Sequence, residues 1–183
     1  MKTIQWITRV LFVVITLTVS GVWVTTPALA DDMTADIETA LDKLCNESET
    51  ARVLKEKAKG ILVFPEIVKG GFIIGGQYGK GRLLIDGKVA GNYSTIQVSY
   101  GLQAGLQEYG YVLFLMTDPA MEYLDKSNGW ELGVGPTIVV VEESASKAFS
   151  TTTLQSDIYA FFFDQTGLMA GLGIQGTKIT KTD

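Results

Sequence analysis

The chain has 183 residues, 46% of them hydrophobic, and contains no low-complexity tract, which is typical of a globular protein of about one domain. Its formal net charge of −5 argues against general nucleic-acid binding, and we expect no nucleic-acid partner. The absence of histidine excludes Ser–His and Cys–His nucleophile pairs, histidine proton shuttles and the commonest transition-metal ligand.

The first 30 residues have the pattern of a secretory signal peptide. Two basic residues precede an apolar run over residues 10–24, and an Ala-x-Ala pattern ends at Ala30. The alternative is an uncleaved membrane anchor, but this run is shorter than the roughly 18 residues of a spanning helix. We therefore expect residues 1–30 to be cut before Asp31 and residues 31–183 to form a single domain. The mature protein would then be exported to the periplasm or the extracellular space, where it can lie peripherally on a membrane.

Residues 34–60 show helical periodicity. Thr34 is suited to cap the first turn, apolar residues recur at the i, i+4, i+7 spacing, and Gly60 is expected to end the segment in the left-handed conformation. The only cysteine, Cys45, falls inside this pattern, and we expect it to be buried and without chemistry. The pattern predicts an amphipathic helix whose basic face is formed by Arg52, Lys55 and Lys59.

The segments after Gly60 read as strands. One strand is expected to end at Pro65, and others flank a glycine-rich stretch that leads to Asp86-Gly87, a dipeptide suited to a two-residue hairpin turn. From residue 95 to residue 107 apolar and polar residues alternate. This alternation predicts one long antiparallel strand.

The last part of the chain contains one helical segment among strands. Asp118 and Pro119 suit the start of a short helix that Gly129 would end, and strand signals occupy residues 109–116, 130–142, 156–163 and 168–179. Glycines at alternate positions of some strands leave a bare face, which predicts close packing or curling. We therefore expect an α+β domain with a strongly curved antiparallel sheet or a barrel-like sheet, an N-terminal amphipathic helix and one short internal helix.

The glycine-rich stretch GGFIIGGQYGKGRLLIDGKV, residues 70–89, has the composition of a phosphate-binding loop but not its spacing. Ile74 stands where a P-loop requires its first glycine, and Gly81 stands where it requires Ser or Thr after Lys80. A dinucleotide fingerprint would open a helix, whereas strand residues follow here. The glycines are therefore interpreted as turn and packing positions in a sheet.

No group of residues suggests catalysis or metal binding. Glu142 and Glu143 are adjacent carboxylates in a polar linker, with no second carboxylate placed opposite them. The segment DKSN, residues 125–128, is too short for a calcium loop. We expect no enzyme activity, no catalytic residue, no metal and no cofactor.

Several motifs, in this order, resemble the SYLF domain family: AKGILVFPEIVKGGFIIGGQYGKG, SYGLQAG, Gly135-Pro136 and YAFFFDQTGLMAGLGIQGTKI. The resemblance implies a non-enzymatic domain that binds anionic lipids, related to the yeast actin-binding SYLF proteins. Eukaryotic members recognise phosphoinositides, and some also bind actin. The chain departs from the family where Tyr93-Ser94 replaces a tryptophan–serine pair and where Asp86 replaces a basic residue.

The charge distribution suggests where lipid would bind. Residues 52–88 contain eight of the 15 basic residues and three acidic ones. We expect a lipid-binding module of the cell envelope that recognises anionic headgroups, with apolar strands near Tyr93 and Tyr100 as the other location. The alternatives are an envelope structural or protein-interaction component without a lipid site, and an enzyme with a carboxylate mechanism. The candidate headgroup ligands are Arg52, Lys55, Lys59, Lys69, Lys80 and Arg82.

Overall fold

The structure is a computed structural model, and it describes residues 28–71, 74–100, 105–126, 130–131, 134–141, 155–166 and 176–182. The expected signal peptide lies almost wholly outside these ranges and stays a prediction. Residues 33–183 form one compact unit, which is described here by itself. Within the described ranges, no helix combines the length and apolar character needed to cross a membrane.

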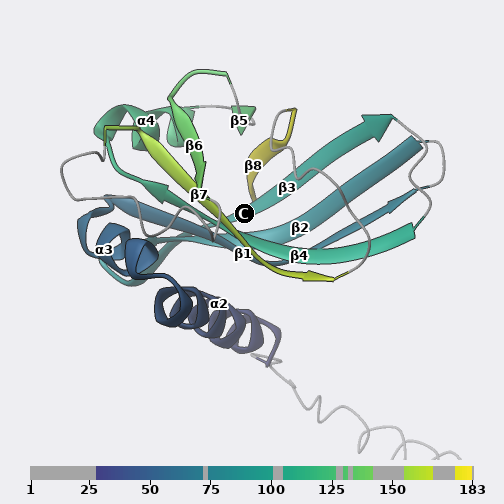
Figure 1. The fold of residues 1–183 in the computed structure, drawn as a ribbon, viewed down its shortest axis with the longest axis horizontal. Helices are drawn as coiled ribbons and strands as arrows, with labels where there is room; N and C mark the ends of the chain where they lie inside the picture. The colour runs from purple at the N-terminus through teal and green to yellow at the C-terminus, as the bar shows by residue number, and fades with distance from the viewer. Residues whose placement is uncertain are drawn as a thin grey trace, which may run out of the picture. The chain divides into compact units, whose positions relative to one another are not determined.

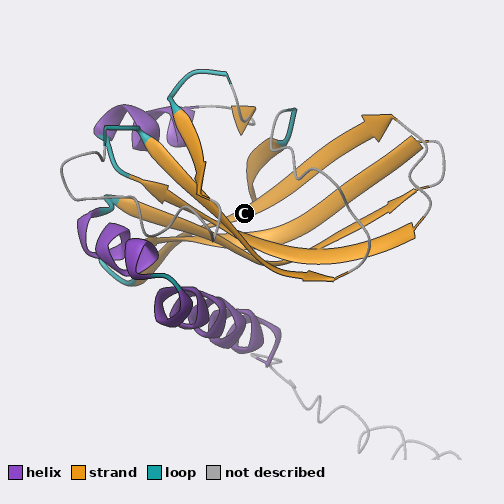
Figure 2. Cartoon of the chain, viewed as in Figure 1, coloured by secondary structure: helices purple, strands orange, loops and turns teal. Residues whose placement is uncertain are grey.

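One sheet organises the unit (Figures 1 and 2). The described residues contribute eight strands to it, in the order β5-β8-β3-β2-β1-β4-β7-β6. Neighbouring strands are antiparallel except β6 and β7, which are parallel. The strands are β1 (Gly60–Gly71), β2 (Ile74–Ile85), β3 (Lys88–Tyr100), β4 (Gly105–Leu115), β5 (Trp130–Glu131), β6 (Ile138–Val141), β7 (Ile158–Thr166) and β8 (Lys178–Thr182).

The expectation of an antiparallel, strongly curved or barrel-like sheet is wrong. The sheet is mixed and open, with β5 and β6 at its two edges, and it is neither closed nor strongly curled. The strand faces that carry glycines do not force the sheet to curl, because side chains of neighbouring strands fill the space that the missing glycine side chains leave. A Cβ at Gly81 would meet the Phe64 ring, and a Cβ at Gly110 would meet the Phe163 ring.

The N-terminal helical segment is two helices instead of one, α2 (Ala28–Glu47) and α3 (Glu49–Lys57). Ser48 separates them, because its extended backbone leaves the helix and its hydroxyl accepts a hydrogen bond from the Ala51 N–H. Ala58 closes α3, and Gly60 begins β1 instead of ending a helix in the left-handed conformation. α2 begins before Thr34, so Thr34 does not cap it.

The other local predictions are partly confirmed. The hairpin turn is present, with positive φ values of 51° at Asp86 and 73° at Gly87. β1 continues through Pro65 by way of a register shift between Val63 and Glu66. The helix α4 spans Asp118–Lys126, and the Thr117 hydroxyl caps it by accepting from the Ala120 N–H at 3.4 Å.

The expected long strand over residues 95–107 is divided between β3 and β4, with residues 101–104 outside the described ranges. Cys45 is half-buried, where full burial was expected.

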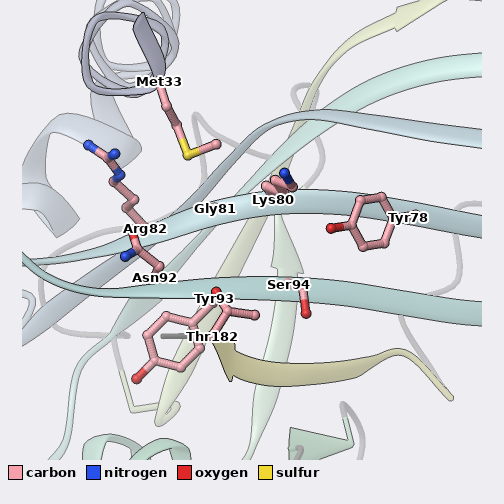
Figure 3. Close-up of a pocket in the computed structure, with 9 residues that line it drawn as sticks. All are labelled: Met33, Tyr78, Lys80, Gly81, Arg82, Asn92, Tyr93, Ser94 and Thr182. Carbon is pink, nitrogen blue, oxygen red and sulfur yellow. The ribbon is translucent and has the colours of Figure 1, made fainter. Parts of the chain in front are cut away.

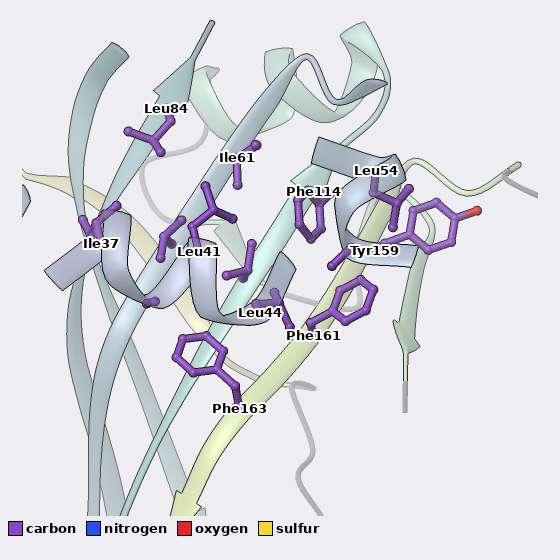
Figure 4. Close-up of a cluster of buried hydrophobic side chains, with 14 of the residues drawn as sticks. Ile37, Leu41, Leu44, Leu54, Ile61, Leu84, Phe114, Tyr159, Phe161 and Phe163 are labelled. Atoms are coloured by element: carbon purple, nitrogen blue, oxygen red, sulfur yellow. The ribbon is translucent and has the colours of Figure 1, made fainter. Parts of the chain in front are cut away.

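Both faces of the sheet are packed at the end that carries the helices. On the helix-side face, α2 and α3 cover a core drawn from β1, β2, β4 and β7 (Figure 4). On the opposite face, Leu62, Leu83 and Leu113 pack with Ala120 and Leu124 of α4. The residues of the helix-side core include Ile37, Leu41, Leu44, Leu54, Ile61, Leu84, Phe114 and Phe161.

Candidate functional site

The alternating residues of β3 and β4 are oriented with their apolar members outward. Ile96, Val98 and Leu106 are 49%, 58% and 65% exposed, whereas Gln97 and Gln107, on the other face, are half-buried. An ordinary amphipathic strand buries its apolar face. In this part of the sheet the usual pattern is therefore reversed: the apolar face is exposed and the polar face is half-buried.

The strand register gathers the exposed apolar side chains on one face. Val68 pairs with Tyr78, Tyr78 pairs with Ile96, and the neighbouring row holds Leu106 and Val98. Residues directly opposite each other in antiparallel strands share a face. This face is the helix-side face, because Tyr78 is in alternation with the helix-side core residue Leu84. We name Val68, Tyr78, Ile96, Val98 and Leu106 the apolar strip.

A hollow of about 330 Å³ lies at the α2 end of the apolar strip, over β2 and β3 (Figure 3). Tyr78 belongs to both, so the two features are continuous. Met33 and Arg82 lie between α2 and the strands in Figure 3, and both line the hollow. Arg82 Nη1 donates to the Thr34 hydroxyl of α2. We name the hollow the basic pocket; its polar lining is Lys80, Arg82, Asn92, Ser94 and Thr182.

The lining of the basic pocket suits an anion. A guanidinium offers a fork of donors, an ammonium offers a compact charge, and the amide and hydroxyl groups add neutral donors. Lys80 is exposed and Arg82 is half-buried. Hydrogen bonds to an incoming phosphate or carboxylate would thus be partly shielded from water, which strengthens them.

The structure brings together only two of the six predicted ligands. Lys80 and Arg82 line the basic pocket, whereas Lys69 lies on the opposite face, beside Gln77 and Gln107 in the strand register. The remaining three cations are exposed and lie in ion pairs: Arg52 with Glu49 at 3.3 Å, Lys55 with Asp42 at 3.2 Å, and Lys59 with Asp118 at 2.6 Å.

Sequence reasoning missed the neutral ligands and the apolar strip. Lys80 lies opposite Ser94 and Arg82 opposite Asn92, but counting back from the Asp86-Gly87 turn would have set each one residue out of register, because the β2–β3 register shifts between Leu83 and Leu84. Met33 and Thr182 come from distant parts of the chain, and no local signal places them. Of the two aromatics considered as an alternative site, Tyr93 is buried, and the side chain of Tyr100 lies outside the description.

Other hollows carry weaker anion chemistry. One of about 320 Å³ lies beside α4, where Lys181 pairs with Asp125 at 3.3 Å. Another of about 240 Å³ has Lys43 among Asp36, Glu66 and Asp164. In the part of the chain that the structure describes, no three His, Cys, Asp or Glu side chains are grouped to hold a metal ion.

Comparison with known families gives one match. Residues 96–183 match the model of the family described as Ysc84, Las17-binding protein actin regulator. The matched segment contains the end of β3 and all later elements, so it includes three of the five residues of the apolar strip, Ile96, Val98 and Leu106. It includes neither Lys80 nor Arg82, which lie on β2. No curated protein matches the chain.

Proposed function

We propose, on the premise that residues 96–183 match the model of the Ysc84 (SYLF) family, that the chain is a non-enzymatic module that binds anionic phospholipid surfaces. The binding surface would be the basic pocket together with the apolar strip. Export to the cell envelope, which the N-terminal sequence predicts, would give the module a membrane to bind. The observation that carries the proposal is the continuity of these two features on one face of the sheet.

The energetics favour a membrane as the partner of this face. A cation near an anionic membrane contributes about 1 kcal/mol, so Lys80 and Arg82 together contribute about 2 kcal/mol. Fully burying an aliphatic side chain is worth about 1.5–3 kcal/mol, and the strip residues are about half-exposed, so each has roughly 1 kcal/mol to gain. Neither contribution alone gives firm binding, but together they give micromolar affinity.

The acidic residues of the same face would determine how the protein is oriented on an anionic membrane. Glu66 lies opposite Lys80 across β1 and β2, and Glu108 lies opposite Val68 across β1 and β4. Anionic headgroups would therefore concentrate over β2 and β3, away from the β4 side. Lys178, opposite Ile96 on β8, adds a cation at the favoured end.

A protein partner is the second candidate. The matched family is described as Las17-binding and as regulating actin, and an exposed apolar strip also suits a protein surface. Cytoskeletal actin is not expected behind an export signal, so an envelope protein would be the partner in this case. This candidate predicts binding that depends on the strip but not on anionic lipid.

Co-sedimentation with liposomes separates the candidates. We expect the protein to pellet with vesicles that contain phosphatidylglycerol and not with neutral vesicles. Lys80→Glu changes the charge by two units, which at about 1 kcal/mol per unit lowers the affinity about 30-fold. Lys55→Glu is the matched control, because Lys55 is also an exposed lysine but lies on α3, outside the pocket.

Two outcomes would contradict the proposal. Equal binding to neutral and anionic vesicles would remove the role of charge and favour the protein-binding candidate. An affinity loss for Lys55→Glu as large as that for Lys80→Glu would show that net charge, and not the pocket, controls binding. A double variant, Val98→Ser with Leu106→Ser, should also weaken binding while leaving its dependence on anionic lipid intact.

A further inference from the structure

A hollow of about 320 Å³ lies between α4 and the sheet, on the face away from the basic pocket. This volume is at the lower end of the range of small-molecule sites. We name it the α4 hollow. Among the described lining residues, the two hollows share only Tyr93, whose ring belongs to the core on the α4 side.

Five apolar side chains line the α4 hollow. Leu83 and Ile85 come from β2, Ala90 comes from β3, and Met121 and Leu124 come from α4. The two leucines are buried, whereas the isoleucine and the methionine are half-buried. A methionine side chain is flexible and adapts to apolar groups of irregular shape. The hollow is therefore suited to the hydrocarbon part of a ligand.

The polar residues of the lining gather around one ion pair. Lys181 Nζ lies 3.3 Å from Asp125 Oδ1. Burial raises the pKa of Tyr93, and the charges of Lys181 and Asp125 also act on this pKa, so the phenol hydroxyl lies near both. Glu122 precedes Asp125 by three residues on α4, and this spacing places the two carboxylates side by side. The hollow thus joins a hydrocarbon lining to a group of charged and polar atoms.

The charges of this lining favour a cationic ligand. Two are negative and one is positive, so an ammonium would neutralise the excess and a carboxylate would increase it. The carboxylates of Glu122 and Asp125 and the hydroxyl oxygen of Tyr93 offer three acceptors to the three N–H groups of an ammonium. Both carboxylates are already in ion pairs, Glu122 with Lys126 and Asp125 with Lys181. These side chains are 52–74% exposed, and ion pairs so exposed add little stability, so a ligand can replace the lysines at little cost.

We infer that the α4 hollow is a binding site for a small aliphatic amine. The hydrocarbon chain of the amine packs against Leu83, Ile85 and Met121, and its ammonium group donates to Glu122 and Asp125. A free amine fits better than a protein surface, because the hollow lies between a helix and the sheet and has the volume of a small-molecule site. The inference does not rest on the proposed lipid-binding function.

Isothermal titration of the protein with n-hexylamine tests the site. We expect saturable binding, and weaker binding of hexanoate and of n-hexanol. n-Butylamine has two methylene groups fewer and should bind about 15-fold more weakly, because each buried methylene contributes about fourfold. Ala90→Phe should abolish saturable binding, because its ring would occupy the hollow. Ala90 is exposed, so the fold should tolerate the larger side chain.

Charge variants test the sign of the ligand. Glu122→Gln combined with Asp125→Asn should weaken n-hexylamine binding about tenfold or more, because two charged acceptors are lost. Lys181→Met should strengthen it, because the cation that competes for Asp125 is removed. Asp118→Asn is the matched control and should bind as the wild type does. Asp118 is an exposed, ion-paired carboxylate of the same helix, outside the described lining of the hollow.

Five results would overturn the inference: no saturable binding by the wild type, hexanoate binding as tight as that of n-hexylamine, unchanged binding by Ala90→Phe, weaker binding by Lys181→Met, or a loss in Asp118→Asn equal to that in the double variant. The melting temperature of each variant, measured in parallel, separates loss of the site from loss of the fold. Tighter binding of the tripeptide Gly-Lys-Gly than of n-hexylamine would also overturn it, in favour of a lysine side chain from a protein partner.

Discussion

Adding one methyl group at Gly79 gives a direct test of why β2 is rich in glycine. A Cβ built at this position would lie 2.7 Å from Ile67 Cγ1 and 2.8 Å from the Glu66 carbonyl oxygen, well inside the roughly 3.5 Å of a normal contact. The carbonyl cannot retreat without disturbing the β1–β2 ladder. Overpacking of this kind costs about 1–3 kcal/mol. We therefore expect Gly79→Ala to lower the free energy of unfolding by about 2 kcal/mol.

Thermal unfolding followed by circular dichroism measures this effect. For a domain of about 150 residues, 2 kcal/mol corresponds to a fall in Tm of about 4–8 °C. The control is Gly76→Ala on the same strand, where the nearest described atom to the new Cβ is the Gln97 carbonyl oxygen at 3.8 Å. Equal melting of the two variants would refute the packing argument. Saturable ATP binding by the wild type, lost in Gly79→Ala, would instead restore a phosphate-loop interpretation.

Two further predictions follow from shifted ionisation. Asp157 accepts hydrogen bonds from the Thr137 N–H and hydroxyl and from the Thr117 hydroxyl, and these bonds lower the pKa of its carboxyl group. The ionised carboxylate therefore stabilises the fold at pH values above its pKa in the unfolded chain, and this stabilisation is lost as the pH falls through its pKa in the folded protein. Asp157→Asn should lower the free energy of unfolding at neutral pH, measured with urea, and should reduce the fall of this free energy between neutral and acidic pH. An unchanged dependence on acidic pH would contradict this. Burial raises the pKa of Tyr109 to about 12, so the folded state holds the phenol proton more firmly than the unfolded chain does. The stability that comes from this difference is lost as the pH rises from the pKa of the unfolded chain towards 12. Tyr109→Phe should remove a late step from the ultraviolet titration, and loss of an early step instead would contradict it.

Local chemistry made some features predictable. The turn at Asp86-Gly87 was predictable because few dipeptides adopt two positive φ values. The break at Ser48 was not predicted, although Ser48 is a good N-cap residue, because the helical periodicity on its two sides looks continuous. Gly60 was misassigned for a related reason: a glycine after a helix is a common terminator, but here the chain enters β1 directly.

The direction and exposure of strands depend on distant parts of the chain. Alternation in residues 95–107 shows that two faces differ in polarity, but not which face the helices cover. In the structure the core that α2 and α3 cover does not include Ile96 or Leu106, and these apolar members of the pattern stay exposed. Likewise, nothing within the sequence of β6 indicates that it pairs in parallel with β7. The cations of the candidate site were predictable from composition, but their cross-strand neighbours were not, because the register between β2 and β3 shifts between Leu83 and Leu84.

The two faces of β2 explain why this strand combines many glycines with long side chains. A strand rich in glycine is prone to slip in register. A slip of one residue would turn Lys80 and Arg82 towards Phe64 and Ile67 in the buried core, which is costly because it buries two charges in apolar surroundings. This asymmetry favours the observed register, which differs by one residue from the register next to the hairpin because of the shift between Leu83 and Leu84. The glycines thus serve close packing on one face, and the same strand can present the proposed headgroup ligands on the other, where it carries Tyr78, Lys80 and Arg82.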